Sequence, residues 1–271
     1  MTDHDYGDLA GAGFGDFELS NLDQALFLIQ EYDLEAQLIA IRGVLSQNRA
    51  ARQLVIEDIE ALNEQMRNRT GGDDEYHMHM ENHWADTLHG TVFQDAAHSM
   101  SAVGMLAPFV ESLFVSIFSG LRTRQQHDDD NHRTRGVRRA RSETDFWDPH
   151  FVFDKKVRRK DLVAGIGQLS ASVGLAPFLP ANCDKALTAL FAYRNKMFHN
   201  GFEWPMEERH KFGKRIENEA WPEGWFTQSN TGGEPWIFYM SDDFIKHCLK
   251  MIDQVLHGVG EYLEQGRSEQ T

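Results

Sequence analysis

The chain contains little cysteine. Its 271 residues include only Cys183 and Cys248. Two cysteines give no disulfide framework of the kind that stabilises small secreted domains, and their spacing fits no zinc-binding pattern. We therefore expect a reducing, cytoplasmic environment, and we expect both thiols to be core residues.

Positive charge is also scarce. The chain has 27 Lys and Arg against 42 Asp and Glu, which gives a net charge of −15 at pH 7. Such a charge does not attract nucleic acid to the molecule as a whole. Any nucleic-acid site therefore has to be a local basic patch that works against this field.

Long apolar runs are missing as well. The most apolar stretch, residues 102–118, contains Pro108 and Glu111 and is shorter than the ~20 residues that a membrane-spanning helix needs. Residues 1–16 contain four Asp and four Gly but no apolar core, so they do not form a signal peptide. We predict a disordered N-terminus and no membrane association.

Helical periodicity dominates the rest of the chain. Apolar residues that recur every three to four positions predict helices over residues 22–66 (with a break near Gly43), 84–122, 159–175, 183–199, 206–220 and 242–265. Aromatic segments on either side of Gly232 and Gly233 predict a β-hairpin. The polar, charge-rich segment 123–150 predicts a flexible loop. We expect an all-α fold, an up-and-down helical bundle with a small C-terminal β-hairpin, over residues 17–271.

One stretch concentrates reactive side chains at the end of a predicted helix: residues 194–201, Arg-Asn-Lys-Met-Phe-His-Asn-Gly. At about 100° per residue, Arg194 falls in the middle of the apolar stripe of that helix. A buried charge without a partner is costly, about 3–5 kcal/mol when a pair is broken. Glu111 lies in the apolar run 102–118, so we predict an ion pair between Arg194 and Glu111.

The neighbouring polar residues suggest phosphate chemistry. Asn195 and His199 are four residues apart and share a face at the edge of the apolar stripe. Arginine binds and stabilises an anionic phosphate, and histidine is suited to moving a proton near neutral pH. In the alternative interpretation, Arg194 is only a structural ion-pair member and His199 only lies at a helix end.

The motif Arg194, Asn195 and His199 resembles the R-x(4–6)-H signature of the HEPN superfamily, in which a polar residue, often Asn, follows the arginine. The resemblance covers roughly residues 84–201 and includes the helical context. It implies a HEPN-like bundle and a metal-independent ribonuclease, without a cofactor, at a homodimer interface. His199 would be the acid or base, Arg194 would bind the scissile phosphate, Asn195 would orient these groups, and Glu111 would hold Arg194.

The resemblance also implies a biological setting and leaves alternatives. Many HEPN proteins are prokaryotic toxins or abortive-infection effectors, so an antitoxin or sensor protein is a further expected partner. HEPN toxins paired with minimal nucleotidyltransferase antitoxins often carry a tyrosine two residues after the histidine, where this chain has Gly201. Regulation by modification of that tyrosine is therefore not expected. Other family members are non-catalytic RNA- or nucleotide-binding modules, and a purely structural helical interaction protein is a third possibility.

The basic residues of the chain concentrate between residues 133 and 160. We expect RNA to contact Lys196 of the motif and seven side chains of this segment: Arg138, Arg139, Arg141, Lys155, Lys156, Arg158 and Arg159. The alternative is a solvated loop balanced by the acidic residues 128–130.

His77, His79 and His83 lie in a predicted acidic loop, where we expect no metal site. Four tryptophans are expected to pack the hairpin onto the bundle rather than stack on bases: Trp204, Trp221, Trp225 and Trp236.

Overall fold

The computed structural model describes residues 19–29, 32–68, 74–127, 138, 141–154 and 157–268. The protein is 75% helical, with two small two-stranded β-hairpins among its described residues. This confirms the predicted mainly helical fold with a small β element. The expected disorder of residues 1–16 lies outside the described residues.

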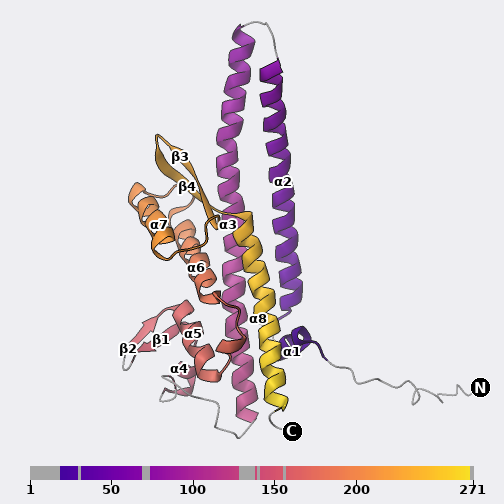
Figure 1. The fold of residues 1–271 in the computed structure, drawn as a ribbon, viewed down its shortest axis with the longest axis vertical. Helices are drawn as coiled ribbons and strands as arrows, with labels where there is room; N and C mark the ends of the chain where they lie inside the picture. The colour runs from indigo at the N-terminus through magenta and orange to yellow at the C-terminus, as the bar shows by residue number, and fades with distance from the viewer. Residues whose placement is uncertain are drawn as a thin grey trace, which may run out of the picture.

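A long helical hairpin forms the axis of the molecule (Figure 1). Helices α2 (Leu34–Asn68) and α3 (Asp74–His127) run antiparallel and extend well beyond the other elements at one end. The short helix α1 (Asn21–Leu28) precedes them and packs mainly on the C-terminal helix α8 (Asp242–Ser268).

The first helical segment is interrupted at a different place from the predicted one. The chain leaves the helix after Leu28 rather than near Gly43, and the new helix α2 starts at Leu34. Asp33 explains the restart, because its carboxylate accepts a hydrogen bond from the N–H of Ala36 at 2.9 Å and so satisfies an unpaired donor of the first turn.

Helix α3 is longer than predicted. It begins at Asp74 instead of residue 84, so the expected acidic, histidine-containing loop is part of a helix. Pro108 lies inside α3 without ending it, and its side chain is exposed. Because proline has no N–H to offer the carbonyl of Gly104, the helix gives up one backbone hydrogen bond there.

Helix α3 is also the centre of the core. By length and composition it is the one described helix that is apolar enough to cross a membrane, but 61% of its apolar window is buried inside the protein. Its fully buried residues include Leu106, Val110, Leu113 and Phe114. Helices α2, α6 and α8 pack around it, which is the burial that a core helix of a bundle requires.

Two lobes lie on one side of this axis. The upper lobe in Figure 1 contains helices α6 (Cys183–Asn200) and α7 (Met206–Asn218) with strands β3 (Phe226–Thr231) and β4 (Glu234–Met240). Its core is an aromatic cluster around Phe212, which contacts the rings of Trp204, Trp221, Phe226 and Phe238.

The expected packing role of the tryptophans is confirmed for three of the four, because Trp204, Trp221 and Trp225 are buried. Trp236 is half-buried and contacts the rings of His89 and Phe93 on α3. Both cysteine side chains are buried, as predicted.

Of the lower lobe, the sequence predicted only the helix within residues 159–175. This lobe contains α4 (Glu143–Trp147), strands β1 (Phe151–Asp154) and β2 (Val157–Lys160), α5 (Leu162–Val173) and the short 3₁₀-helix η1 (Ala176–Phe178). The described parts of the expected flexible loop are ordered: residues 123–127 end helix α3, and residues 138 and 141–150 belong to this lobe. All four residues of β2 are exposed, so the strand has no apolar alternation from which periodicity could predict it.

Candidate functional site

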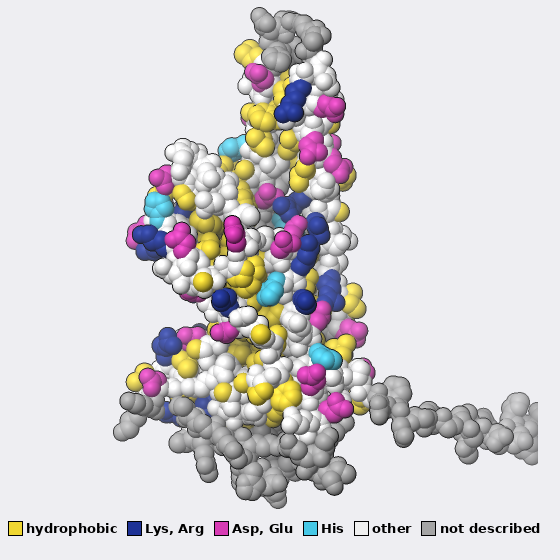
Figure 2. Space-filling view, in the orientation of Figure 1, with side chains coloured by type: hydrophobic (Ala, Val, Ile, Leu, Met, Phe, Trp, Pro, Cys, Tyr) yellow, Lys and Arg dark blue, Asp and Glu magenta, His cyan; other side chains and the backbone are white. Residues whose placement is uncertain are grey.

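A cleft separates the two lobes, and helix α3 forms its floor. Figure 2 shows the surface hollowed between the upper and lower lobes. The cleft has a volume of about 1020 Å³, at the upper end of the ~300–1,000 Å³ range of small-molecule sites. Its polar and aromatic lining includes Glu111, His150, Lys160, Asp161, Gln168, Asp184, Thr188, Phe191, Arg194, Asn195 and Arg215.

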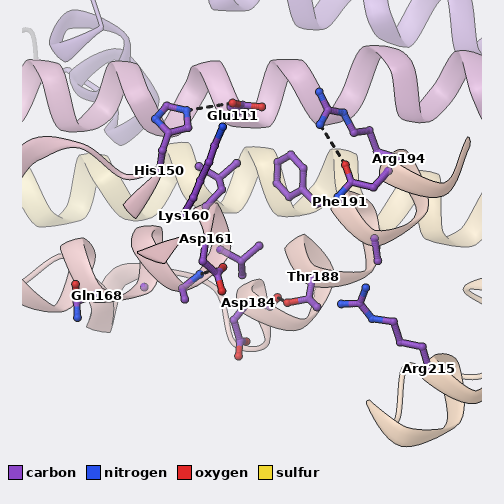
Figure 3. A pocket seen from close by; sticks show the side chains of 16 residues that line it. Glu111, His150, Lys160, Asp161, Gln168, Asp184, Thr188, Phe191, Arg194 and Arg215 are labelled. Atoms are coloured by element: carbon purple, nitrogen blue, oxygen red, sulfur yellow. Dashed lines mark hydrogen bonds and ion pairs between the residues drawn. The ribbon is translucent and has the colours of Figure 1, made fainter. Parts of the chain in front are cut away.

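The predicted ion pair between Arg194 and Glu111 is not formed, although both side chains line this cleft (Figure 3). The guanidinium of Arg194 donates to Oδ1 of Asn195 at 3.2 Å. Glu111 instead accepts from Nε2 of His150 at 3.1 Å. The helical wheel placed Arg194 in the middle of a buried stripe, but the cleft opens on this side of α6, so the arginine is only half-buried and reaches solvent.

His150 is the residue that takes Arg194's expected place beside Glu111. Its Nδ1 lies 2.8 Å from Oδ1 of Asp148, and the same carboxylate oxygen accepts the backbone N–H of His150 at 2.9 Å. The imidazole is therefore fixed between two carboxylates, one from the loop before β1 and one from α3. Both ring nitrogens of His150 are thus within hydrogen-bonding distance of a carboxylate oxygen.

Asn195 and His199 lie on an exposed face of α6, as the spacing predicted. Asn195 lines the cleft, whereas His199 is not among the cleft-lining residues. Helix α6 ends at Asn200, and Gly201 takes a backbone conformation with φ of 71°, which favours glycine. Phe198, beside His199, is 55% exposed, so the last turn of α6 presents both an aromatic and a histidine side chain to solvent.

The helix that carries the motif is anchored from two sides. Tyr193 is fully buried and donates from its hydroxyl to the carbonyl of Phe238 on β4 at 2.9 Å. Burial raises the pKa of this phenol, so it stays a hydrogen-bond donor. Lys196 forms an ion pair with Glu208 on α7. The expectation that Lys196 contacts RNA is therefore not supported, because its ammonium group already joins α6 to α7.

Arg138 was predicted to contact RNA, and this is wrong. Its side chain is 0% exposed. Its guanidinium donates to the carbonyl oxygens of residues 145, 146, 148, 151 and 165 and to the side chain of Gln168. Burial lowers the pKa of Arg138 to about 10 against the opposing effect of Asp148 and Asp145, which still leaves it charged at neutral pH.

Arg138 therefore organises the wall of the cleft. The carbonyls that it binds flank His150 on both sides along the chain, and Gln168 in turn exchanges two hydrogen bonds with the backbone of Phe153. One buried cation thus joins the segment before β1, the strand itself and α5. A basic residue in a polar segment looks like a surface residue in the sequence, and only its burial reveals the structural role.

Of the other residues predicted to contact RNA, three have described partners within the protein and three lie outside the described residues. The guanidinium of Arg141 lies over the ring of Phe153. Arg158 stacks on Phe151 at 3.5 Å and pairs with Asp145 at 3.3 Å. Arg159 is paired with Asp161 but keeps two thirds of its side chain exposed. Arg139, Lys155 and Lys156 lie outside the described residues.

Two cations of the cleft have no acidic partner among the described residues: Arg194, and Lys160 at the end of β2. The third, Arg215 on α7, is bound to Glu219 at 2.6 Å. Of the acidic groups, Asp161 is paired with Arg159 and accepts the N–H of Ala164 as the cap of α5. Arg194 and Lys160 are therefore the cleft cations that remain available to an anionic ligand.

Most of the other cleft-lining residues were not predicted as site residues from the sequence, among them His150, Phe191 and Arg215. Lys160 and His150 belong to the basic segment and its predicted loop, so their position could have been inferred only by knowing that this loop folds against α3. No group of three or more His, Cys, Asp and Glu side chains in the described part of the chain is arranged to hold a metal ion.

Comparisons with protein-family models, with curated proteins and with solved structures find no match to this chain.

Proposed function

We propose that this protein is a metal-independent endoribonuclease with a HEPN-like helical bundle, in which Arg194, Asn195 and His199 act on an RNA phosphate. One observation carries the proposal. Arg194 lines a large cleft with no carboxylate bound to it among the described residues, about one and a half helical turns before the exposed His199.

The free guanidinium matters because an arginine neutralised by a buried carboxylate has little affinity left for phosphate. Here its one described hydrogen bond is to the neutral side chain of Asn195, so its charge and its remaining donors are available to a ligand in the cleft that it lines. Planar guanidinium groups bind phosphate oxygens in a bidentate manner. Arg194 is therefore equipped to bind the scissile phosphate and the extra negative charge of its transition state.

The chemistry needs no metal. The ribose 2′-hydroxyl loses its proton to a base and attacks the adjacent phosphorus, the bond from phosphorus to the 5′-oxygen breaks, and the leaving oxygen takes a proton. The products are a 2′,3′-cyclic phosphate and a 5′-hydroxyl. His199 is the proton-transferring group in this scheme, and Asn195 orients Arg194 through their hydrogen bond.

The proposed active form is a homodimer. Arg194 and Asn195 line the cleft, whereas His199 lies outside the cleft lining on the last turn of α6. A two-fold partner that packs on this turn, over the exposed Phe198, brings two copies of His199 close to two copies of Arg194. The cellular role that we propose is that of a cytoplasmic toxin or anti-phage effector in a prokaryote, controlled by an antitoxin or sensor protein.

The test is cleavage of a mixed RNA sample by purified protein in the presence of EDTA. We expect products that end in 2′,3′-cyclic phosphate, and we expect His199→Ala to abolish cleavage while the circular dichroism spectrum is retained. His257→Ala is the matched control, because His257 is also an exposed helical histidine, 62% exposed on α8. Cleavage that persists in His199→Ala would refute the proposal.

A second candidate is a non-catalytic RNA- or nucleotide-binding module. The position of His199 outside the cleft favours it, because a binding site needs Arg194 but not the histidine. In that case the wild-type protein binds RNA and leaves it intact, and His199→Ala binds as tightly as the wild type.

A further inference from the structure

A single phenylalanine lines the described part of the cleft. Phe191, on α6, is half-buried: one side packs against the core and the rest lines the cleft. The rings of the upper lobe contact one another around Phe212, but Phe191 has no ring contact with another described aromatic side chain. One part of its apolar surface is therefore available to a ligand.

The two unpaired cations line the same cleft as this ring. In Figure 3 the ring of Phe191 is seen between Lys160, which extends from the end of β2, and Arg194, one turn further along α6. Leu162 and Val163 at the start of α5 line the same cleft and add apolar surface. In this view the order is therefore Lys160, Phe191 and Arg194. The aliphatic side chains of Leu162 and Val163 line the cleft from the lower lobe.

This order matches one nucleoside of a single strand and the two phosphates that flank it. Proteins bind single-stranded nucleic acid by stacking bases on aromatic rings and placing cations along the backbone. A free mononucleotide carries phosphate on one side of its nucleoside only and leaves one cation without a partner. A duplex keeps its bases stacked on each other and does not present one to Phe191.

We propose that the cleft is a nucleotide subsite for single-stranded RNA, with a base stacked on Phe191, the scissile phosphate on Arg194 and the adjacent phosphate on Lys160. This subsite rests on the proposed ribonuclease function and specifies its substrate class. It also reconciles an acidic protein with an RNA substrate, because two phosphate contacts and one stacked base require no extended basic surface.

The subsite is tested by binding alone, with a 2′-O-methyl RNA hexamer that no 2′-hydroxyl attack can cleave. We expect Phe191→Leu to weaken hexamer binding about tenfold, since stacking of one base on an aromatic ring contributes roughly that factor or more. Phe191→Tyr keeps the aromatic face and should bind within about twofold of the wild type. Phe27→Leu, at a 61% exposed phenylalanine on α1, is the control for the loss of a ring elsewhere.

Salt dependence tests the cations separately. Two phosphate contacts on a single strand predict that log Kd rises with log salt concentration with a slope of about 1.4, and Lys160→Gln should lower the slope to about 0.7. Lys246→Gln, at a 57% exposed lysine on α8, should leave the slope unchanged. A residue with only a structural role would not change this slope.

The outcomes separate the subsite from the proposed function. Hexamer affinity that does not change in folded Phe191→Leu overturns the subsite, as does binding of a mononucleotide or an RNA duplex as tight as that of the hexamer. If the wild type binds the hexamer with the expected Phe191 and Lys160 dependence but does not cleave unmodified RNA, the subsite stands and the ribonuclease proposal fails. If the wild type cleaves RNA through His199 but Phe191→Leu binds the hexamer as tightly as the wild type, the ribonuclease proposal stands and the subsite fails.

Discussion

The carboxylate of Glu111 lies 3.1 Å from Nε2 of His150, and this contact leaves Arg194 without an acidic partner among the described residues. A residue on the core helix α3 thus binds a histidine of the lower lobe across the floor of the cleft. The consequence for function is direct, because Arg194 keeps its charge for a ligand.

The first prediction compares substitutions of Arg194 with a substitution of Glu111. Arg194→Ala should lower kcat for RNA cleavage by about 10²–10³, the effect of removing one donor that stabilises transition-state charge. Arg194→Lys should be intermediate, since an ammonium group cannot bind phosphate in a bidentate manner. Glu111→Gln should lower kcat less than about tenfold, because Glu111 does not hold Arg194. Single-turnover kinetics measure all three, and a Glu111→Gln defect equal to that of Arg194→Ala would contradict the observed pairing.

The second prediction concerns Arg138. Arg138→Met removes every donor from a group of buried carbonyls, so we expect a loss of about 3–5 kcal/mol in the free energy of unfolding. Urea denaturation measures the loss, and hydrogen exchange should show it first in the backbone around β1 and α4. Arg159→Met is the control, since its side chain is 67% exposed and its effect should stay within about 0.5 kcal/mol. Equal stability of the two variants would refute the structural role.

The third prediction is a pH dependence of stability that involves His98. This side chain is buried where α2, α3 and the start of α8 meet. Burial, followed by the charge of Arg52, lowers its pKa below 6.5, against the opposing effect of Asp242, which lies 3.4 Å away. The unfolded chain therefore binds the extra proton more readily than the folded one, and the free energy of unfolding should fall as the pH is lowered through 6.5.

His98→Gln should flatten this dependence between pH 7 and pH 5, as followed by urea denaturation. A smaller slope should remain, because the pKa of His247 is also lowered, by burial and by Lys250. His257→Gln, at an exposed position, should keep the wild-type slope. Stability that rises on acidification through 6.5 would show that the protonated form of His98 is favoured in the folded protein.

The fourth prediction compares two helical glycines. A Cβ added at Gly258 would lie 1.9 Å from the carbonyl oxygen of Phe178, where α8 packs on η1, whereas nothing lies within 4 Å of one added at Gly43. Gly258→Ala should destabilise the protein by about 3 kcal/mol, whereas Gly43→Ala should stabilise it by about 0.5–1 kcal/mol through its higher helix propensity. Thermal denaturation should show Tm shifts of opposite sign, and a neutral Gly258→Ala would refute the close approach.

Helices and their ends were predicted well where apolar spacing was regular. The prediction for α6, residues 183–199, differs from the observed Cys183–Asn200 by one residue, because its apolar stripe is continuous and Gly201 favours the backbone conformation at its end. The β3–β4 hairpin was also predicted, from aromatic segments around a Gly-Gly turn. Asn182 immediately precedes α6 but makes no side-chain capping bond.

Apart from helix α5, which lies within the predicted residues 159–175, the lower lobe and the cleft were not predictable in the same way. Strand β2 has four exposed residues and no alternation, and Arg138 has the sequence surroundings of a surface loop. The wrong prediction of an Arg194–Glu111 ion pair has the same cause. Two charges on apolar stripes suggested a pair, but a third group, His150, reached Glu111 from a segment that looked flexible.

The amino-acid sequence by itself determined the helical class of the protein. It also placed Arg194, Asn195 and His199 within one turn and a half of a single helix. Both could be predicted because periodicity and i, i+4 spacing are local properties of the chain. Only the tertiary structure decided which charges meet. Ion pairing, burial and the free surface of Phe191 depend on segments far apart in sequence, and the energy of burying Arg138 depends on carbonyl groups that come together only when the lower lobe folds against α3.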